Sequence, residues 1–279
     1  MLFSFRKFKF DLNQRVESYV GKMKNLIFDI KEFSINDGPG VRITVFLKGC
    51  PLRCKWCHNP EGLEYVREKN LLTNSFFGEE WGEEALVDYL CKFKELFLIS
   101  NGGVTFSGGE PLTHLEFLLS VSSSLKERGI HTCVQTSGFV SPSLFKEKII
   151  NAFDLFLYDL KIINQEKHIG FTGKSNARIL LNLQNLAVSG KQYIIRVPLI
   201  PGITDTTENF EDMVCFLKNL ETKPISVEFL NYNEFAPGKY PAVGKVFPLN
   251  IVEKKVNVEN VINTCETLAS LNINAKFRK

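Results

Sequence analysis

The sequence lacks several features that would place it in a special class of protein. In its 279 residues, no apolar run reaches the roughly 18–20 residues that a membrane-spanning helix needs. Its first ten residues alternate aromatic and basic side chains, and so they lack the continuous apolar segment of a secretory signal peptide. The formal net charge of +3 is too small to indicate a polyanionic partner. These absences predict a cytoplasmic protein that needs neither a membrane nor a nucleic acid as a partner.

The spacing of a disulfide framework is also absent, although the chain has seven cysteines. Three of them lie close together, at Cys50, Cys54 and Cys57. The other four stand alone, at Cys91, Cys133, Cys215 and Cys265. An odd number of cysteines without paired spacing is typical of a reducing compartment. We expect the four isolated cysteines to be structural, because a free cysteine packs like a small hydrophobic residue.

Short apolar runs of the strand type alternate along the chain with longer segments of helical periodicity. Strands are predicted at residues 25–30, 42–47, 103–107, 132–136, 155–159, 193–197 and 225–230, and helices at residues 83–97, 115–128, 143–152, 176–189, 207–220 and 258–271. This alternation predicts βαβ units and a parallel sheet. About six such units favour an α/β fold of the partial (β/α)6-type TIM barrel over an open sheet.

Two regions differ from this regular pattern. Residues 1–22 are unlike the rest of the chain, and Met23 stands just ahead of the first predicted strand. We therefore expect an N-terminal extension at 1–22 and one core domain at 23–279, which includes a C-terminal helix and strand. Residues 231–247, rich in glycine, proline and tyrosine, follow the last core strand and are predicted to form a functional loop.

The three clustered cysteines lie in one loop, which follows the predicted strand that ends at Leu47. Barrels build their active sites at this carboxyl end of the strands. Cysteine runs with short spacers hold iron–sulfur clusters, and a cubane with three protein ligands keeps one iron open for a small molecule. Structural zinc is the alternative, but it prefers four ligands, and His58 directly after the last cysteine is poorly placed to be the fourth.

Residues 37–59, which join Asp37-Gly-Pro-Gly-Val-Arg42 to the cysteine run, resemble the signature of the radical S-adenosylmethionine (SAM) superfamily. They are most similar to the glycyl-radical-enzyme activating enzymes, such as that of pyruvate formate-lyase, and the similarity runs from about Phe28 to Gly244. The resemblance implies that Cys50, Cys54 and Cys57 bind a 4Fe–4S cluster whose open iron is chelated by the methionine end of SAM. One electron then cleaves SAM to a 5′-deoxyadenosyl radical, which abstracts hydrogen from a glycine of a partner glycyl radical enzyme.

Two further motifs match the SAM site of this family. Gly108, Gly109 and Glu110 match its Gly-Gly-Glu motif, which the resemblance assigns to the amino group of SAM. Asp159 and Lys161 lie two apart at a predicted strand end and so point the same way. They match the family's Asp-Leu-Lys motif, in which the lysine lies near the methionine carboxylate.

Four more residues complete the predicted cofactor-binding set together with Cys57. Trp56 is expected to shield the cluster, to lie against the nucleoside or simply to pack. His58 begins a segment that resembles the family at residues 58–62. Arg196 suits either a contact with SAM or a structural charge at a strand end. Asn233 stands where these enzymes usually have histidine, and it can hydrogen-bond a ribose hydroxyl. The resemblance requires no catalytic acid or base, because the deoxyadenosyl carbon takes the hydrogen atom itself.

Many of the activating enzymes that this chain resembles carry a ferredoxin-like insert with further cysteines just after the SAM cluster. Between Cys57 and Gly103 this chain has Cys91 alone, so we predict a single 4Fe–4S cluster in an anaerobic enzyme. Its electron would come from an external donor such as flavodoxin or ferredoxin. The alternative is a radical SAM enzyme that acts on a small molecule such as a deazaguanine precursor. The segment from Asp37 to Arg42 favours the activating enzyme.

Overall fold

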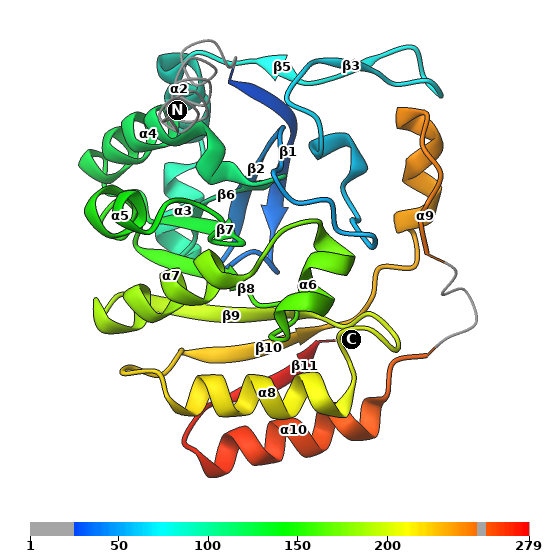
Figure 1. Cartoon of the computed structure of the whole chain (residues 1–279). Helices are drawn as coiled ribbons and strands as arrows, with labels where there is room; N and C mark the ends of the chain where they lie inside the picture. The colour runs from blue at the N-terminus through cyan, green and yellow to red at the C-terminus, as the bar shows by residue number, and fades with distance from the viewer. Residues whose placement is uncertain (1–24, 250–254, 279) are drawn as a thin grey trace, which may run out of the picture.

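The computed structural model describes residues 25–249 and 255–278, and it shows a mixed sheet with helices along one side (Figure 1). The predicted N-terminal extension, residues 1–22, lies outside the described residues. The sheet order is β11-β10-β9-β8-β7-β6-β2-β1-β5. Its strands are β1 (Leu26–Ser34), β2 (Arg42–Leu47), β5 (Glu79–Glu80), β6 (Gly103–Gly108), β7 (Thr132–Thr136), β8 (Leu155–Asp159), β9 (Gln192–Pro198), β10 (Ser226–Leu230) and β11 (Ala275–Arg278).

The strands from β2 through β6 to β11 pair in parallel, as the alternating pattern predicts. The first strand, β1, is antiparallel to β2, and the short β5 is antiparallel to β1. Among the described residues, the end strands β5 and β11 do not pair with each other. The sheet is therefore a partial barrel, which leaves one side of its interior open.

Helices connect the parallel strands, and several of them follow the outer side of the sheet from the top left to the bottom of Figure 1. They are α2 (Glu83–Cys91), α3 (Lys94–Ser100), α4 (Leu115–Glu127), α5 (Pro142–Leu144), α6 (Gln165–Thr172), α7 (Ala177–Val188), α8 (Thr207–Lys218), α9 (Ala236–Lys239) and α10 (Val258–Ser270). Helical turns are η1 (Pro60–Gly62), η2 (Pro111–His114), the π-helical η3 (Phe145–Ile149) and η4 (Tyr240–Val243), and a separate hairpin pairs β3 (Glu68–Lys69) with β4 (Phe76–Phe77). None of the described helices is long and apolar enough to cross a membrane.

The two faces of the sheet carry different side chains, because successive residues of a strand point to opposite sides. The outer face contributes Phe106, Phe156 and Phe229 to a large apolar core that the helices complete. Each of these phenylalanines is fully buried, which stabilises the fold by about 1.5–3 kcal/mol per side chain. The inner face carries polar side chains, such as those of Gln135 and Arg196, which hydrogen-bond each other. The barrel interior thus has polar side chains beside the apolar residues Leu155, Leu157 and Ile194.

Two predicted helices differ from the structure, and the helix α6 was missed. The helix expected at residues 83–97 is divided into α2 and α3, with Phe93 as the N-cap of the second helix. Part of the helix expected at residues 143–152 is the π-helical turn η3. The helix α6 was not predicted at all, because Ile169 and Phe171 are its only large apolar residues and form no helical stripe. Its boundaries come instead from the N-cap Asn164 and from Gly173, whose φ is +77°.

Candidate functional site

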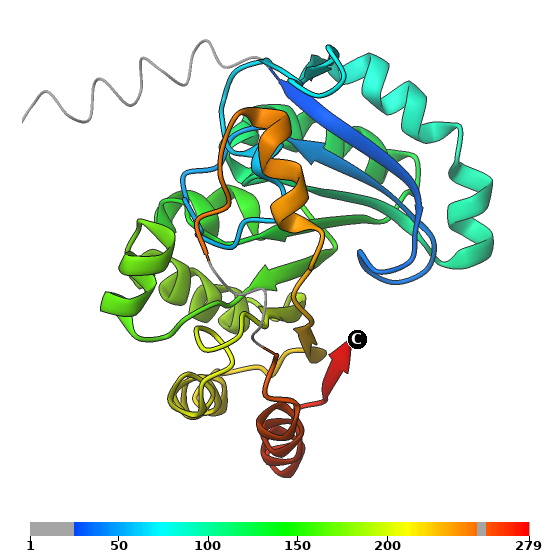
Figure 2. The ribbon, with the colours of Figure 1, turned by 90° about the vertical axis from the view of Figure 1, so that its right-hand side faces the viewer.

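The cysteine loop lies beyond the carboxyl end of β2, on the side of the molecule that faces the viewer in Figure 2. One side of the loop is bonded to the turn after β6, since the amide of Glu110 donates to the Gly49 carbonyl at 2.8 Å. The other side is bonded to the end of α6. The amides of Arg53 and Lys55 donate to the carbonyls of Thr172 and Phe171, at 2.8 and 2.9 Å. Backbone contacts therefore fix the loop at both sides.

The thiols of Cys50, Cys54 and Cys57 are free and half-buried. Burial raises the pKa of each to about 12, and each thiol also acts on the pKa of another member of the trio. The three thiols therefore lie within electrostatic reach of one another. The described residues contain no group of three His, Cys, Asp or Glu side chains that could hold a metal ion. In a 4Fe–4S cluster, unlike a site for a single metal ion, each thiolate binds a different iron atom. Three thiols in one loop are therefore a suitable donor set for such a cluster.

Gly108 and Gly109 allow the turn after β6 to pack directly on the cysteine loop. A Cβ atom on Gly109 would lie 2.3 Å from the Gly49 oxygen and 2.4 Å from the Gly62 oxygen. A Cβ on Gly108, whose φ is +119°, would lie 2.2 Å from the Leu47 oxygen. These glycines belong to the Gly-Gly-Glu motif, which the resemblance assigns to the amino group of SAM. In the structure, they bring the turn close to the backbone of the cysteine loop.

Glu110 is buried, with 1% of its surface exposed, and it joins the ends of β6 and β7. Its carboxylate accepts hydrogen bonds from the Thr136 hydroxyl at 2.6 Å, from the Ser137 amide and hydroxyl at 2.8 and 2.5 Å, and from the Leu112 amide at 3.2 Å. Burial raises the pKa of Glu110 by more than these hydrogen bonds lower it. Four donors are close to the capacity of one carboxylate. The contact with the amino group of SAM therefore stays a prediction.

Asp159 and Lys161 form an ion pair beside the cysteine loop. The Lys161 ammonium lies 3.0 Å from Asp159 Oδ2, and 9% of the lysine side chain is exposed. Burial lowers the pKa of Lys161, but Asp159 and the thiol of Cys54 raise it by more, so that the net pKa is above the usual value. Lys161 is therefore a charged ammonium group within electrostatic reach of the Cys54 thiol, and its contact with the methionine carboxylate stays a prediction.

A chain of polar contacts leads from this ion pair into the barrel. Gln135, at the end of β7, donates to Asp159 Oδ1 at 3.4 Å and accepts from Arg196 Nη1 at 3.3 Å. Arg196 also pairs with Asp37 at 3.5 Å and with Glu228 at 3.6 Å. Gln135 was not among the residues predicted for the site, although it lies near the carboxyl end of a predicted strand.

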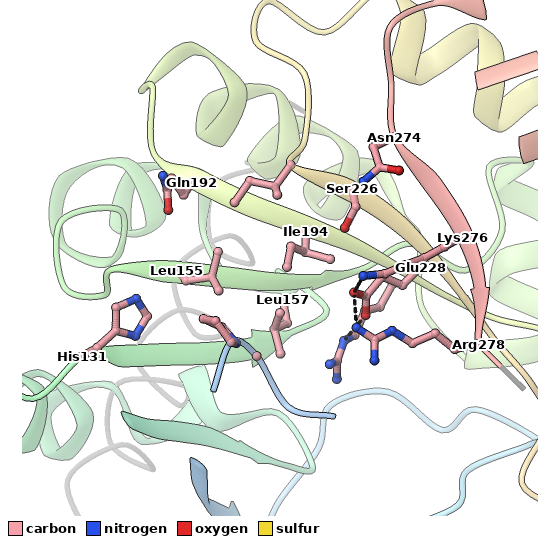
Figure 3. Close-up of a pocket in the computed structure, with 14 residues that line it drawn as sticks. His131, Leu155, Leu157, Gln192, Ile194, Ser226, Glu228, Asn274, Lys276 and Arg278 are labelled. Atoms are coloured by element: carbon pink, nitrogen blue, oxygen red, sulfur yellow. Dashed lines mark hydrogen bonds and ion pairs between the residues drawn. The ribbon is translucent and has the colours of Figure 1, made fainter. Parts of the chain in front are cut away.

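Glu228 is a second residue that sequence reasoning missed, and it lies in a pocket on the inner face of the barrel (Figure 3). Only 2% of its side chain is exposed, and its carboxylate pairs with Arg278 at 2.7 Å and with Lys276 at 3.1 Å. The pocket has a volume of about 340 Å³, and Gly38 and Pro39 form part of its wall. Nothing in the local pattern of β10 distinguishes Glu228, because its partners come from β9 and β11.

The other predicted residues occupy different surroundings. Trp56 is 4% exposed and packs against Phe171, with ring centroids 6.1 Å apart, in a small apolar cluster that includes Cys54. The side chain of His58 is exposed. Asn233 is also exposed, and its side-chain oxygen accepts the amide of Phe235 at 3.0 Å, which stabilises its own turn. Trp56 therefore packs beside Cys54 in the cysteine loop.

The predicted functional loop, residues 231–247, contains α9 and η4 and contacts the cysteine loop directly. The Tyr240 hydroxyl donates to the Cys57 carbonyl at 3.0 Å. The Lys239 ammonium donates to the side chains of Glu61 and Asn59, at 2.6 and 3.0 Å. These contacts fasten the segment after the last cysteine from a third direction.

Comparisons with known proteins agree with this geometry. Residues 36–180 match the family described as a 4Fe–4S single cluster domain. The trans-4-hydroxy-L-proline dehydratase activating enzyme of Clostridioides difficile is 34% identical over an alignment of 276 positions, which covers 81% of this chain and 90% of the relative. The 4-hydroxyphenylacetate decarboxylase activating enzyme of C. difficile strain 630 is 33% identical over an alignment of 280 positions, which covers 81% of this chain and 87% of the relative.

Among solved structures, a domain of pyruvate-formate lyase-activating enzyme from Bacteroides vulgatus matches with a TM-score of 0.53 and 26% identity, over 64% of this chain and 99% of that domain. The family match covers the cysteine loop, the Gly-Gly-Glu turn and the Asp159–Lys161 pair. The sequence identity, the alignment coverage and the fold all indicate the same family of enzymes. The chain belongs to the glycyl-radical-enzyme activating enzymes of the radical SAM superfamily.

Proposed function

We propose that this protein activates a partner glycyl radical enzyme by removing one hydrogen atom from the α-carbon of a glycine. The observation that carries the proposal is the convergence of the three thiols with the Asp159–Lys161 pair at the carboxyl edge of the parallel sheet. Cys50, Cys54 and Cys57 would hold the cluster. When bound, the cluster and SAM supply a carbon-centred radical that takes the hydrogen atom.

The task of the side chains is to bind and orient the methionine end of SAM. Lys161 supplies a charged donor for a carboxylate, and Asp159 supplies an acceptor for an ammonium group. Both charges act strongly here, because little water reaches the buried lysine. Trp56 and Phe171 cover the loop near Cys54 and exclude water, which protects a reactive radical from side reactions.

We assign the other predicted residues to positions around this centre. Gly108 and Gly109 set the distance between the turn and the cysteine loop, and Glu110 holds the ends of β6 and β7 together. Arg196 reaches the Asp159 carboxylate through Gln135. His58 and Asn233 are proposed contacts of the nucleoside, because both residues are exposed to solvent.

The substrate is a protein, so its glycine must reach the inner face of the barrel. The pocket beside Gly38 and Pro39 supports entry at this point, because it adjoins the end strand β11 and the segment between β1 and β2. The segment at residues 231–247 would border the opening on the cluster side. The electron would come from an external one-electron donor such as flavodoxin or ferredoxin.

Electron paramagnetic resonance tests the proposal. The anaerobically reconstituted protein, SAM and dithionite are incubated with each candidate glycyl radical enzyme, and a glycyl doublet is expected with its own partner. A partner in which the glycine is replaced by alanine is the control and should show no doublet. If no candidate gives a doublet while a small molecule, such as a deazaguanine precursor, is consumed, the small-molecule alternative replaces the proposal.

A further inference from the structure

Lys48 is a fully buried cation two residues before Cys50, and the proposed function gives it no task. It follows β2 and stands where the cysteine loop begins. A buried ammonium group loses its contact with water, and replacing a buried ion pair with apolar side chains of similar volume is often neutral or stabilising. The stability of the fold therefore does not by itself account for a lysine at this position.

The ammonium group of Lys48 joins the two arms of the cysteine loop. Its Nζ donates to the Glu61 carbonyl at 2.5 Å, and Glu61 lies in η1, which follows the last cysteine. One residue further along each arm, the Gly49 amide donates to the Gly62 carbonyl at 2.8 Å. The side-chain bond and the backbone bond together hold the arm that enters the loop against the arm that leaves it.

The same ammonium group also binds the hairpin of β3 and β4. Lys48 Nζ lies 2.7 Å from Glu68 Oε2, and 20% of the glutamate side chain is exposed. Gly78, whose φ is +96°, directly follows β4, and a Cβ atom on it would lie 2.6 Å from Lys48 Cδ. The hairpin therefore closes over Lys48, because it packs on the lysine stem through Gly78 and binds the ammonium group through Glu68.

The main chain of Lys48 is also bonded on both sides. Its amide donates to the Leu26 carbonyl of β1 at 2.8 Å. Its carbonyl accepts a hydrogen bond from His114 Nε2 at 2.6 Å, and His114 ends η2, which follows the Gly-Gly-Glu turn. Lys48 therefore binds β1, η1, η2 and β3, so that four elements beside the cysteine loop meet at this residue.

A second cation holds the same turn from the segment at residues 231–247. The Lys239 ammonium pairs with the Glu61 carboxylate at 2.6 Å, whereas Lys48 binds the Glu61 carbonyl. The hairpin is joined to that segment as well, because the Leu71 amide donates to the Ala242 carbonyl at 2.9 Å. Lys48, the hairpin and residues 231–247 therefore form a closed circuit of contacts that includes Glu61.

We propose that Lys48 is a positioning residue for the cluster. It fixes the two arms of the cysteine loop relative to each other, so that the thiolates of Cys50 and Cys57 keep the separation that a 4Fe–4S cluster requires. Lys48 acts through the loop and moves neither an electron nor a proton. Removing a group that orients metal ligands typically weakens metal binding by about 10–100-fold. The inference rests on the proposed function only for the presence of the cluster.

The first test measures amide hydrogen exchange in the protein without iron. Lys48→Met keeps a side chain of similar length but removes the ammonium group. The amides of Gly49 and Cys50 should then exchange about tenfold faster than in the parent, because their bonds to the other arm open more often. The control is Tyr193→Phe, which removes a buried hydroxyl bonded to the Thr222 carbonyl and should leave both amides unchanged. Parent-like exchange in Lys48→Met would overturn the proposal.

The second test measures how firmly the reconstituted protein keeps its cluster. Loss of the cluster to a chelator, followed anaerobically by its absorbance, should be about tenfold faster in Lys48→Met and unchanged in Tyr193→Phe. The electron paramagnetic resonance spectrum of the dithionite-reduced cluster should broaden in Lys48→Met alone, because the ligand positions vary between molecules. If exchange and cluster loss stay as in the parent and only the reduction potential shifts, Lys48 acts through its charge and the proposal is wrong.

A milder variant keeps the proposal testable if Lys48→Met does not fold. Glu68→Ala removes the partly exposed carboxylate and should speed cluster loss about threefold, the effect of such an ion pair. Lys69→Ala, which changes the exposed next residue of β3, is the control. Equal rates of cluster loss in these two variants would overturn the proposal. None of these measurements needs a partner enzyme, so failure to form a glycyl radical would remove the proposed function and leave this inference to be decided by them.

Discussion

Two buried charged side chains at the carboxyl edge of the sheet, those of Glu110 and Lys161, differ in their hydrogen-bond partners. Glu110 is satisfied by four donors of the protein itself, whereas Lys161 has Asp159 as its hydrogen-bond partner and lies near the thiols. The first arrangement holds two strand ends together. The second keeps a charged group available for a ligand.

The cysteine trio gives the first prediction. Cys54→Ser removes one of three thiolates, so the protein should hold less than a tenth of the iron of the parent and should not cleave SAM. Iron analysis and chromatography of 5′-deoxyadenosine measure the two effects. Cys215→Ser is the matched control. Cys215 is exposed on α8, so its replacement should change neither the iron content nor SAM cleavage. Retained SAM cleavage in Cys54→Ser would remove the cluster assignment.

The buried carboxylate of Glu110 gives the second prediction. In Glu110→Gln, an amide NH₂ replaces one acceptor oxygen and leaves buried donors of Thr136 or Ser137 without a partner. We expect the free energy of unfolding to fall by about 1–3 kcal/mol, the usual cost of such a loss. Urea denaturation measures it, and Glu116→Gln, an exposed carboxylate on α4, should change little. Equal stability of the two variants would contradict the role of Glu110.

The third prediction concerns pH. Burial raises the pKa of Asp37, but a hydrogen bond from Ser34 and the charge of Arg196 lower it by more, so its net pKa is below the usual value. A carboxyl group with a lowered pKa in the folded state stabilises the fold above its unfolded pKa of about 3.9, and this contribution is lost as the pH falls further.

Asp37→Asn should therefore lose less stability than the parent between about pH 4 and pH 2. The urea midpoint measured at intervals over that range, with pH 7 as the reference, gives the comparison. If Asp37→Asn loses as much stability between pH 4 and pH 2 as the parent does, Asp37 does not contribute to the pH dependence of stability. Glu116→Gln again serves as the control for removal of an exposed carboxylate.

At the scale of elements, the turn after β6 and the helix α6 together position the cysteine loop. The turn contacts Gly49 and Gly62, and α6 contacts Arg53 and Lys55. Local sequence predicted the turn, because its glycines are distinctive. It did not predict α6, since a short helix without an apolar stripe has no periodic signal.

Two glycines in these elements give the fourth prediction. Gly109→Ala places a methyl group within 2.4 Å of two backbone oxygens, so the cysteine loop must shift, and we expect lower stability and a lower iron content. In Gly170→Ala, on α6, the methyl group meets no atom within 4 Å, and the helix should gain about 0.5–1 kcal/mol. Thermal unfolding and iron analysis of both variants check this. Equal behaviour would mean that the close packing at Gly109 is unimportant.

At the scale of the whole molecule, one cysteine trio provides for one cluster. Anaerobic reconstitution should yield about four iron and four sulfide per chain. Iron and sulfide analysis, with the Cys91→Ser variant as a control for the isolated cysteines, gives the number. A clearly higher content that depends on Cys91 would show a second cluster.

The sequence by itself determined the positions of the main strands, the cysteine trio and the Gly-Gly-Glu and Asp-Leu-Lys motifs. Each of these signals is local, because strand periodicity, turn residues and ligand spacing all lie within about ten residues of chain. Only the tertiary structure revealed the contacts of Gln135, Arg196 and Glu228, and the packing of Gly109 on Gly49. These residues come from strands and loops that are far apart in the sequence and become neighbours through the order of the strands in the sheet. Short-range sequence patterns do not determine which strands become neighbours.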